Sequence, residues 1–346
     1  MTKSILDDEI REQPEVLRNL LQVEKDNIQK IADDLRGKFK YIVIAARGTS
    51  DNAARYAQYL FGAHNHIQVA LATPSLFSVY NSPPDLSEAL VICISQSGQS
   101  PDIVSVITEG HRQGRPTLAI TNDCYSPLAK NADHIIFLNC KEEKAVAATK
   151  TYTSSLLSLA LFSCFLGNHT NWLTQLERVP DAVKQTILLI QNNIQHVERY
   201  RYVEHCVVIG RGFNYPTAFE IALKIKELTH VVAVPYSSAD FKHGPIATVH
   251  RGFPVVVIAP SGELMMDMLE FINYLKQLGA ELIVISDNDQ VLETAQLPFR
   301  IPAGLPEWIS PIAAILPGQF FSMKLAIERN LDPDKPEGIT KITETL

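Results

Sequence analysis

Hydroxyl side chains gather directly after two apolar runs in the first half of the chain, residues 41–44 and 90–94. The polar residues of these two loops are Thr49, Ser50, Ser95, Gln96, Ser97 and Ser100. A turn of small residues that opens a helix directs free backbone N–H groups at an anion, and hydroxyls donate further hydrogen bonds. The sequence therefore predicts a phosphate-binding site that needs no lysine. The alternative is that these residues only cap helices.

An acidic and a basic side chain stand three residues apart in a segment expected to be helical, residues 216–229. Lys224 and Glu227 therefore project from one helical face. A carboxylate can carry a proton between neighbouring carbon atoms, which makes Glu227 a candidate general base. The alternative is an ion pair on the surface of the helix.

His243 is a second candidate for proton transfer, in the loop of residues 240–245. Gly244 permits close backbone approach and Pro245 stiffens the exit of this loop. A histidine titrates near neutrality and can shuttle a proton. The alternative is a structural or merely exposed histidine. No histidine or cysteine has the spacing of a metal site, so no metal is expected.

Short β-branched runs precede the polar loops and must position them. These runs are residues 41–44, 90–94 and 117–120 in the first half and 205–209, 254–258 and 281–284 in the second. Such non-alternating runs are typical of strands that helices cover on both faces of a parallel sheet. Helices are expected over residues 51–61, 102–113 and 265–278. In such α/β domains, ligands bind beyond the carboxyl ends of the strands, where the polar loops lie.

The second half of the chain repeats the first at an offset of 164 residues, as from Arg47 to Arg211. The strand-like runs match in this register. Three serines of the first copy are replaced in the second as follows: Ser95 by Ala259, Ser97 by Ser261 and Ser100 by Leu264. Because the second copy lacks two of the three hydroxyls, phosphate is expected to bind only in the first.

A chain of 346 residues exceeds the roughly 250–300 residues that one core usually supports. We expect an N-terminal helix within residues 1–35, a phosphate-binding domain over residues 36–185, a second domain over residues 195–330 and a tail over residues 331–346. The leading helix is expected over residues 10–35, with Pro14 in or near its first turn.

Composition excludes several classes of protein. A net charge of −7 argues against binding nucleic acid or an anionic membrane through a broad positive field. Five cysteines without a CxxC pair are expected to be reduced core residues. The N-terminus lacks the apolar region of a signal peptide, and residues 156–166 are too few to span a bilayer. We therefore expect a cytoplasmic protein in which residues 156–166 form a buried helix.

Several segments together resemble tandem sugar isomerase (SIS) domain proteins, such as the isomerase half of glucosamine-6-phosphate synthases. The matching segments are 95–98, 148–150, 210–212, 224–227, 242–245 and the tail around Lys341. Segments 46–51, 95–102 and 143–150 are similar also to the SIS-type glucosamine-6-phosphate deaminases. The resemblance implies an α/β fold of two repeated three-layer αβα domains, each with a mainly parallel sheet.

The same resemblance implies roles for particular residues. It places the phosphate at Thr49, Ser50, Ser95, Gln96, Ser97 and Ser100, further substrate contacts at Gly48, Val146 and Ala147, and catalysis at Lys224, Glu227, His243 and Lys341. It also implies a small sugar phosphate as the partner, no cofactor, and a homodimer with the site near the subunit interface.

The tail combines two prolines, a glycine and four charges over residues 331–338, a composition that resists helix and sheet. Ile339 and Ile342 are expected to dock its tip while Lys341 points into a site. The resemblance implies that this lysine acts at the sugar carbonyl and that the tail closes the active site. The alternative is a frayed terminus.

The synthases carry an additional N-terminal glutaminase domain, whereas here Met1 and Thr2 lead almost directly into the sugar-binding half. Glutamine hydrolysis is therefore not expected. The leading expectation is a glucosamine-6-phosphate deaminase that gives fructose 6-phosphate and ammonia by aldose–ketose isomerisation. One alternative is another aldose/ketose phosphosugar isomerase, or a deaminase of another amino-sugar or glycated sugar phosphate. A further alternative is a non-catalytic sugar-phosphate sensor, for which Glu227, His243 and Lys341 would be unnecessary.

Overall fold

The computed structural model describes residues 4–341. Contacts divide the chain into two units, each built around one five-stranded sheet. Among the described residues, the N-sheet unit comprises residues 15–143, 150–177 and 340–341, and the C-sheet unit comprises residues 4–14, 144–149 and 178–339. Both units are therefore assembled from segments that are distant in the sequence.

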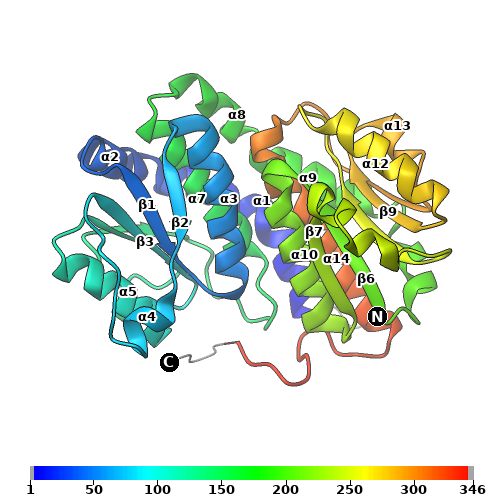
Figure 1. The fold of residues 1–346 in the computed structure, drawn as a ribbon, viewed down its shortest axis with the longest axis horizontal. Coiled ribbons are helices and arrows are strands. Elements are labelled where there is room, and N and C mark those ends of the chain that lie inside the picture. Colours follow the sequence, from blue (N-terminus) through cyan, green and yellow to red (C-terminus); the bar gives the residue numbers. More distant parts are fainter. Residues whose placement is uncertain (1–3, 342–346) are drawn as a thin grey trace. The chain divides into compact units, whose positions relative to one another are not determined.

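All five strands of the N-sheet unit run parallel (Figure 1). They are β1 Tyr41–Ala45, β2 Gln68–Leu71, β3 Ala89–Ser95, β4 Thr117–Thr121 and β5 His134–Phe137, in the sheet order β2-β1-β3-β4-β5. Every residue of β3 and β4 is buried, which explains why apolar and polar residues do not alternate along them. Because β1 and β3 are neighbours, the two polar loops that follow them lie at the same edge of the sheet.

The C-sheet unit repeats this arrangement. Its parallel strands are β6 His205–Gly210, β7 Val232–Ser237, β8 Pro254–Ile258, β9 Glu281–Ser286 and β10 Leu297–Arg300. Their sheet order β10-β9-β8-β6-β7 is the order of the first sheet, read from the other edge. The predicted repeat of two α/β domains, each with a parallel sheet, is thus confirmed.

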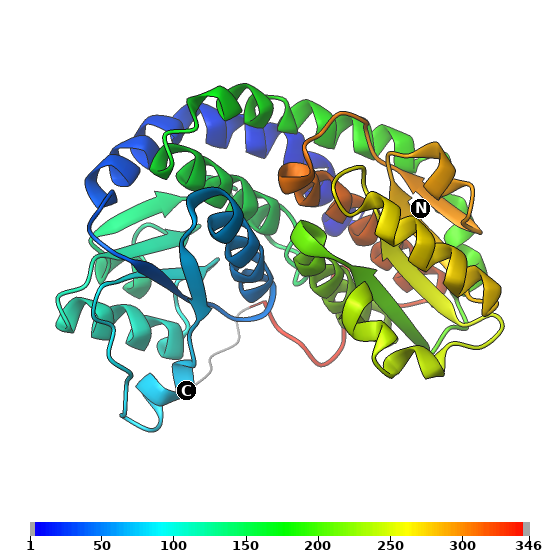
Figure 2. The same cartoon turned by 45° about the horizontal axis from the view of Figure 1, so that its top comes forward.

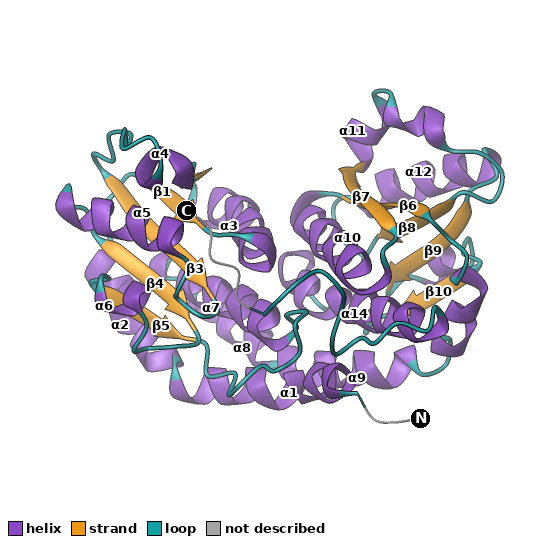
Figure 3. Cartoon of the chain, turned by 90° about the horizontal axis from the view of Figure 1, so that it is seen from below, coloured by secondary structure: helices purple, strands orange, loops and turns teal. Residues whose placement is uncertain are grey.

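Helices cover both faces of each sheet, so each unit has three layers (Figure 3). In the N-sheet unit they are α2 Lys25–Leu35, α3 Gly48–Asn65, α4 Pro74–Ser78, α5 Pro101–Arg112, α6 Pro127–Lys130, α7 Lys150–Leu166 and α8 Leu173–Glu177. In the C-sheet unit they are α9 Val179–Ile190, α10 Tyr215–Thr229, α11 Ser238–Lys242, α12 Met265–Gln277, α13 Asp289–Leu292 and α14 Ser310–Glu328. Short 3₁₀ helices span Thr170–Trp172, Ile194–Tyr200, Gly212–Asn214, Pro245–Thr248 and Glu307–Ile309.

Two helices form the centres of their units. Every residue of α7 is buried, where the helix packs against α2 and α3, so the prediction of a buried helix over residues 156–166 is confirmed. In the C-sheet unit, α14 packs along α10 (Figure 2). Among the described residues, no helix is both long enough and apolar enough to cross a bilayer.

The N-terminal helix differs from its prediction. It is two helices, α1 Ile5–Val23 and α2, and Pro14 lies in the interior of α1 rather than in its first turn. The helix begins early because the Asp334 carboxylate accepts hydrogen bonds of 2.9 Å from the N–H groups of Ile5 and Leu6. Proline cannot bond the carbonyl of Ile10, and the Gln13 side-chain amide donates to that carbonyl instead, at 3.0 Å.

All five cysteines are free thiols, and four of them are buried. Burial raises the pKa of Cys164 to about 11 and that of Cys206 to about 12. Cys124 is only half-buried, so the expectation that every cysteine lies in a core is wrong for this one. Within residues 4–341, no group of three histidine, cysteine, aspartate or glutamate residues is arranged to hold a metal ion.

Candidate functional site

The loop between β3 and α5 is a tight turn built from the predicted serines. Ser95 Oγ accepts a hydrogen bond of 3.1 Å from the N–H of Gly98, and Ser97 Oγ accepts one of 3.3 Å from the N–H of Gln99. Gly98 has φ +61°, and a Cβ atom there would lie 2.2 Å from Ser126 Oγ. Only glycine fits this turn. Ser100 is the residue before α5, but its side chain makes no capping hydrogen bond.

An ion pair joins the polar loop after β1 to the start of α5. Arg47 Nε donates a hydrogen bond of 2.8 Å to Oδ2 of Asp102, whose side chain is fully buried in the first turn of α5. Helix α3 begins directly after Arg47, so Thr49 and Ser50 lie in its first turn rather than in a preceding loop. The structure therefore brings all six predicted phosphate residues to one sheet edge, beside the N-termini of two helices. We call this region the cradle.

The corresponding loop of the C-sheet unit is occupied by the chain's own carboxylates. Asp287 Oδ1 accepts a hydrogen bond of 2.7 Å from the N–H of Ser261, and Glu307 Oε2 accepts one of 2.8 Å from the N–H of Glu263. A Cβ atom on Gly262 would lie 2.2 Å from the same Glu307 oxygen. The N–H groups of Ser261 and Glu263 are therefore already bonded within the chain.

Further substrate contacts were predicted at Gly48, Val146 and Ala147. Gly48 is the first residue of α3 and has φ +53°, a conformation that favours glycine. Val146 is half-buried and Ala147 is buried, in the segment of residues 144–149 that belongs to the C-sheet unit.

Lys341 is held by a residue that the sequence analysis did not select. Its Nζ donates a hydrogen bond of 2.9 Å to Oε2 of Glu143, whose side chain is fully buried. The N–H and the hydroxyl of Thr151 also donate to this carboxylate, at 3.1 and 2.8 Å. The only signal for Glu143 in the sequence is its place at the start of the matched segment 143–150.

The described part of the tail, residues 331–341, contains no helix or strand, as predicted. Ile339 is 40% exposed, so the expectation that this residue docks the tip is wrong. The ion pair of Lys341 with Glu143 holds the tail at this point instead. Ile342, the second residue expected to dock, lies outside the described residues.

Helix α10 carries a buried cluster of charges. Lys224 Nζ donates a hydrogen bond of 2.6 Å to Glu227 Oε2 and lies 3.4 Å from Glu220 Oε1. The Lys224 and Glu220 side chains are buried and that of Glu227 is 23% exposed, which excludes an ion pair on the surface. Burial alone would lower the pKa of Lys224, but the charges of Glu220 and Glu227 raise it well above its ordinary value.

His243 follows α11, and Gly244 beside it has φ +128°. The histidine is exposed, and its backbone N–H donates to the carbonyl of Asp240 at 3.0 Å. Among the described residues, no hydrogen bond or ion pair joins His243 to Lys224 or Glu227. The structure therefore pairs Lys224 with Glu227 and, within residues 4–341, joins His243 to neither of them by a hydrogen bond.

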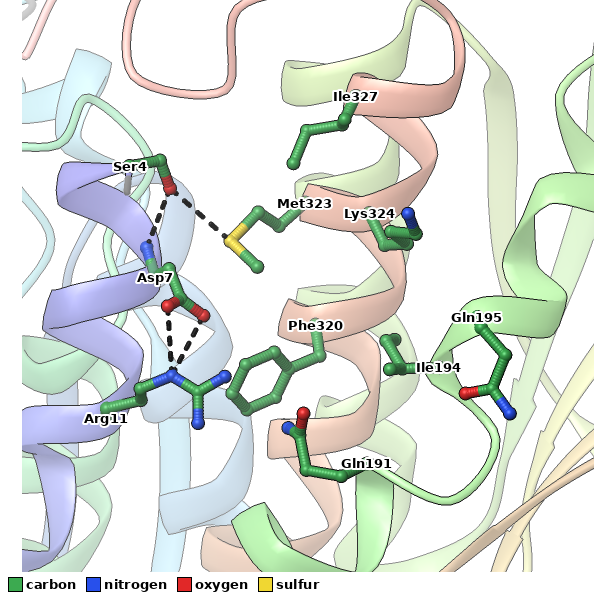
Figure 4. Close-up of a pocket in the computed structure, with 10 residues that line it drawn as sticks. All are labelled: Ser4, Asp7, Arg11, Gln191, Ile194, Gln195, Phe320, Met323, Lys324 and Ile327. Carbon is green, nitrogen blue, oxygen red and sulfur yellow. Dashed lines mark hydrogen bonds and ion pairs between the residues drawn. The ribbon is translucent and has the colours of Figure 1, made fainter. Parts of the chain in front are cut away.

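A cavity of about 350 Å³ lies elsewhere in the C-sheet unit (Figure 4). It is lined by Ser4, Asp7, Arg11, Gln191, Ile194, Gln195, Phe320, Met323, Lys324 and Ile327. The Arg11 guanidinium is bonded to Asp7 and lies 5.2 Å from the centre of the Phe320 ring. No predicted site residue lines this cavity.

Comparison with known proteins identifies the repeat. The SIS domain family model matches residues 38–163 and 200–329, one match on each sheet. A glutamine–fructose-6-phosphate aminotransferase [isomerizing] from Pyrococcus horikoshii is 33% identical over 340 residues. That match covers 96% of this chain and 56% of the relative, so the chain spans about half the length of the curated relatives it matches.

Two solved structures share the fold. The C-terminal domain of glucosamine-fructose-6-phosphate aminotransferase from Francisella tularensis has a TM-score of 0.87 at 28% identity, covering 96% of this chain and 98% of that one. The glucosamine-6-phosphate deaminase from Thermotoga maritima has a TM-score of 0.80 at 22% identity, covering 99% and 100%, a likeness of fold alone. With family matches on both of its parallel sheets, the chain belongs to the SIS domain family.

Proposed function

We propose that the chain is a phosphosugar isomerase that acts as a glucosamine-6-phosphate deaminase and releases fructose 6-phosphate and ammonia. The observation that carries the proposal is the Lys224–Glu227 pair, a partly exposed carboxylate on a buried ammonium. An isomerase needs a base to move a proton between neighbouring carbons. A sensor that only binds a sugar phosphate has no use for such a base.

The proposed reaction has three steps. His243 transfers the proton that opens the sugar ring to the aldehyde form. Glu227 removes the proton from C2 while the C1 oxygen gains a proton, which gives an enol at C1. Glu227 then returns its proton to C1 while the nitrogen releases one, which leaves an imine at C2. Water adds to the imine, the bond from C2 to nitrogen breaks, and ammonia leaves as the C2 ketone forms.

The remaining predicted residues are assigned to binding and to charge. Phosphate would accept hydrogen bonds from the cradle, because N–H groups at helix N-termini and serine hydroxyls suit an oxyanion. The Lys224 ammonium would hold the Glu227 carboxylate in place through their hydrogen bond. Lys341 would act at C1 and C2 as an electrophile. No cofactor is required for any of these steps.

The test incubates purified protein with a panel of hexosamine 6-phosphates and assays ammonia and ketose phosphate together. Equal amounts of both products from the glucosamine compound support the deaminase. Ketose phosphate from an aldose phosphate without ammonia would favour the isomerase alternative. Saturable binding without any turnover would favour the sensor.

The variant Glu227→Gln separates chemistry from binding. The amide keeps the shape of the side chain and loses its basicity, so sugar-phosphate affinity should stay nearly unchanged while turnover falls at least about 100-fold. The direct readout is exchange of deuterium from solvent into C1 or C2. Persistent exchange in this variant would remove Glu227 as the base.

We further propose that the protein is a cytoplasmic homodimer with its site near the subunit interface. The proposal rests on membership of the SIS domain family. Light scattering of the purified protein measures the mass in solution. A mass equal to one chain at all concentrations would contradict the dimer.

A further inference from the structure

Glu9 is a buried carboxylate in α1 that bonds two consecutive backbone N–H groups of a distant loop. Its Oε1 accepts from the N–H of Lys144 at 2.5 Å, and its Oε2 accepts from the N–H of Ala145 at 3.2 Å. Only 4% of Glu9 is exposed. Glu9 and both partners belong to the C-sheet unit.

A carboxylate in this position is costly. Taking a charge out of water is unfavourable unless hydrogen bonds compensate for it, and an apolar side chain of similar size would often stabilise a core as well or better. Charge-assisted hydrogen bonds are, however, stronger and more directional than neutral ones. Glu9 therefore fixes the conformation of the backbone at Lys144 and Ala145.

The backbone that Glu9 fixes leads directly into the predicted substrate contacts. Val146 and Ala147 have apolar side chains, so they can read sugar hydroxyls only through their backbone N–H and C=O groups. Such groups discriminate only when the chain that carries them is held in place. On the other side of the segment, the neighbouring Glu143 is itself bonded to Thr151 and Lys341.

The first turns of α1 are also restrained. The Asp334 carboxylate caps the helix at Ile5 and Leu6, and Ser4 Oγ accepts from the N–H of Asp7 at 3.0 Å. Glu9 lies about one turn further along the helix. The carboxylate that holds the loop therefore projects from a helix end that is itself anchored.

We propose that Glu9 is a positioning residue for the sugar end of the substrate, acting through the backbone of residues 144–147. The proposal rests on the proposed function and on the predicted substrate contacts at Val146 and Ala147, which are taken to read the sugar. The proposal gives Glu9 no role in binding the phosphate group. Its loss should therefore weaken recognition of the sugar and leave recognition of inorganic phosphate unchanged.

The experiment compares Glu9→Gln with Glu15→Gln in the full chain. Glutamine at residue 9 keeps one acceptor oxygen but turns an NH₂ group toward the second N–H, so one of the two bonds is lost. Glu15 lies on the same helix, is 77% exposed and pairs with Arg18, so its variant is the matched control. The readouts are kcat and KM for glucosamine 6-phosphate, and inhibition by inorganic phosphate.

We expect Glu9→Gln to lower kcat/KM at least about tenfold, the effect of losing one hydrogen bond to a charged group. The inhibition constant of phosphate should stay within about twofold of the control. A kcat/KM equal to that of Glu15→Gln overturns the proposal. So does a parallel loss of phosphate affinity, since that would indicate general damage to the fold.

A binding arm keeps this test separate from the test of the proposed function. If the parent protein turns over no amino sugar, the deaminase assignment fails on its own. The dissociation constants of glucose 6-phosphate and inorganic phosphate are then compared by calorimetry for both variants. A weaker constant for the sugar phosphate alone in Glu9→Gln supports the positioning role, and unchanged constants for both ligands overturn it.

Discussion

Lys341 and Glu143 are 198 residues apart in the chain, yet the lysine Nζ lies 2.9 Å from Oε2 of the glutamate. The Glu143 side chain is fully buried and that of Lys341 is 23% exposed. A covered pair of this kind restrains both partners far more than an exposed one, because separating it leaves an uncompensated buried charge. The pair thus fixes the tail at the lysine that the family resemblance marks as catalytic.

Deleting residues 337–346 should lower turnover at least about 100-fold, the usual cost of removing one electrophilic group from an active site. The thermal midpoint should also fall, because the buried Glu143 carboxylate loses the Lys341 ammonium and keeps its hydrogen bonds from Thr151. Steady-state kinetics and a thermal melt of the truncated chain measure both effects. Normal turnover would show that Lys341 is not catalytic.

Asp334→Ala should destabilise the protein by about 1 kcal/mol, because the N–H groups of Ile5 and Leu6 lose a carboxylate at a helix N-terminus. Urea unfolding measures this loss of stability. Glu337→Ala, an exposed change in the same tail, is the control, and equal behaviour of the two variants would contradict the capping role.

Local sequence was sufficient to predict six of the ten strands in the described residues, the repeat and the placement of the polar loops. The apolar runs forecast β1, β3, β4, β6, β8 and β9, because strand burial leaves a local signal. The misses depend on partners remote in the chain. The start of α1 depends on Asp334, which is 329 residues from Ile5. The hydrogen bond at the Glu263 N–H depends on Glu307, which is 44 residues away. No local pattern encodes such pairings.

Ser95→Ala together with Ser97→Ala should weaken sugar-phosphate binding by about 1.5–3 kcal/mol for each hydroxyl lost to the phosphate. Ser261→Ala is the matched control from the second copy, where carboxylates already occupy the loop. Calorimetry with the same ligand compares them. Because Ser95 and Ser97 also bond loop N–H groups, a thermal melt must accompany each measurement. Equal weakening by Ser261→Ala would refute the single-site prediction.

Lys224→Met should destabilise the protein by about 3–5 kcal/mol, because the buried Glu220 and its neighbour Glu227 lose their counter-ion. The raised pKa of Lys224 means that its stabilising contribution is complete below the unfolded value and is lost only as pH rises through the folded one. The difference in unfolding free energy between the parent and Lys224→Met should therefore be constant between pH 7 and pH 9.

Acidification should reduce the loss of unfolding free energy caused by Lys224→Met. Without the ammonium, burial favours the protonated form of Glu220, so the variant recovers stability as pH falls. Urea unfolding of both proteins from pH 5 to pH 9 records the difference. A deficit that grows on acidification would contradict the view that uncompensated carboxylates cause it.

The Glu307 carboxylate in the loop of the second copy should make the stability of the protein depend on pH. Partial burial raises the pKa of Glu307, and the N–H of Glu263 opposes that rise. A carboxyl group with a raised folded pKa contributes stability below its unfolded value, about 4.3, and loses that contribution as pH rises through the folded value. Glu307→Gln, which cannot ionise, should match the parent in stability near pH 4 and exceed it at pH 7.

Glu307→Ala should be less stable than Glu307→Gln at both pH values, because the Glu263 N–H loses its acceptor and space opens beside Gly262. Urea unfolding at the two pH values separates these effects. Identical pH profiles for the parent and Glu307→Gln would mean that the loop compensates the carboxylate completely, as it would a bound external anion.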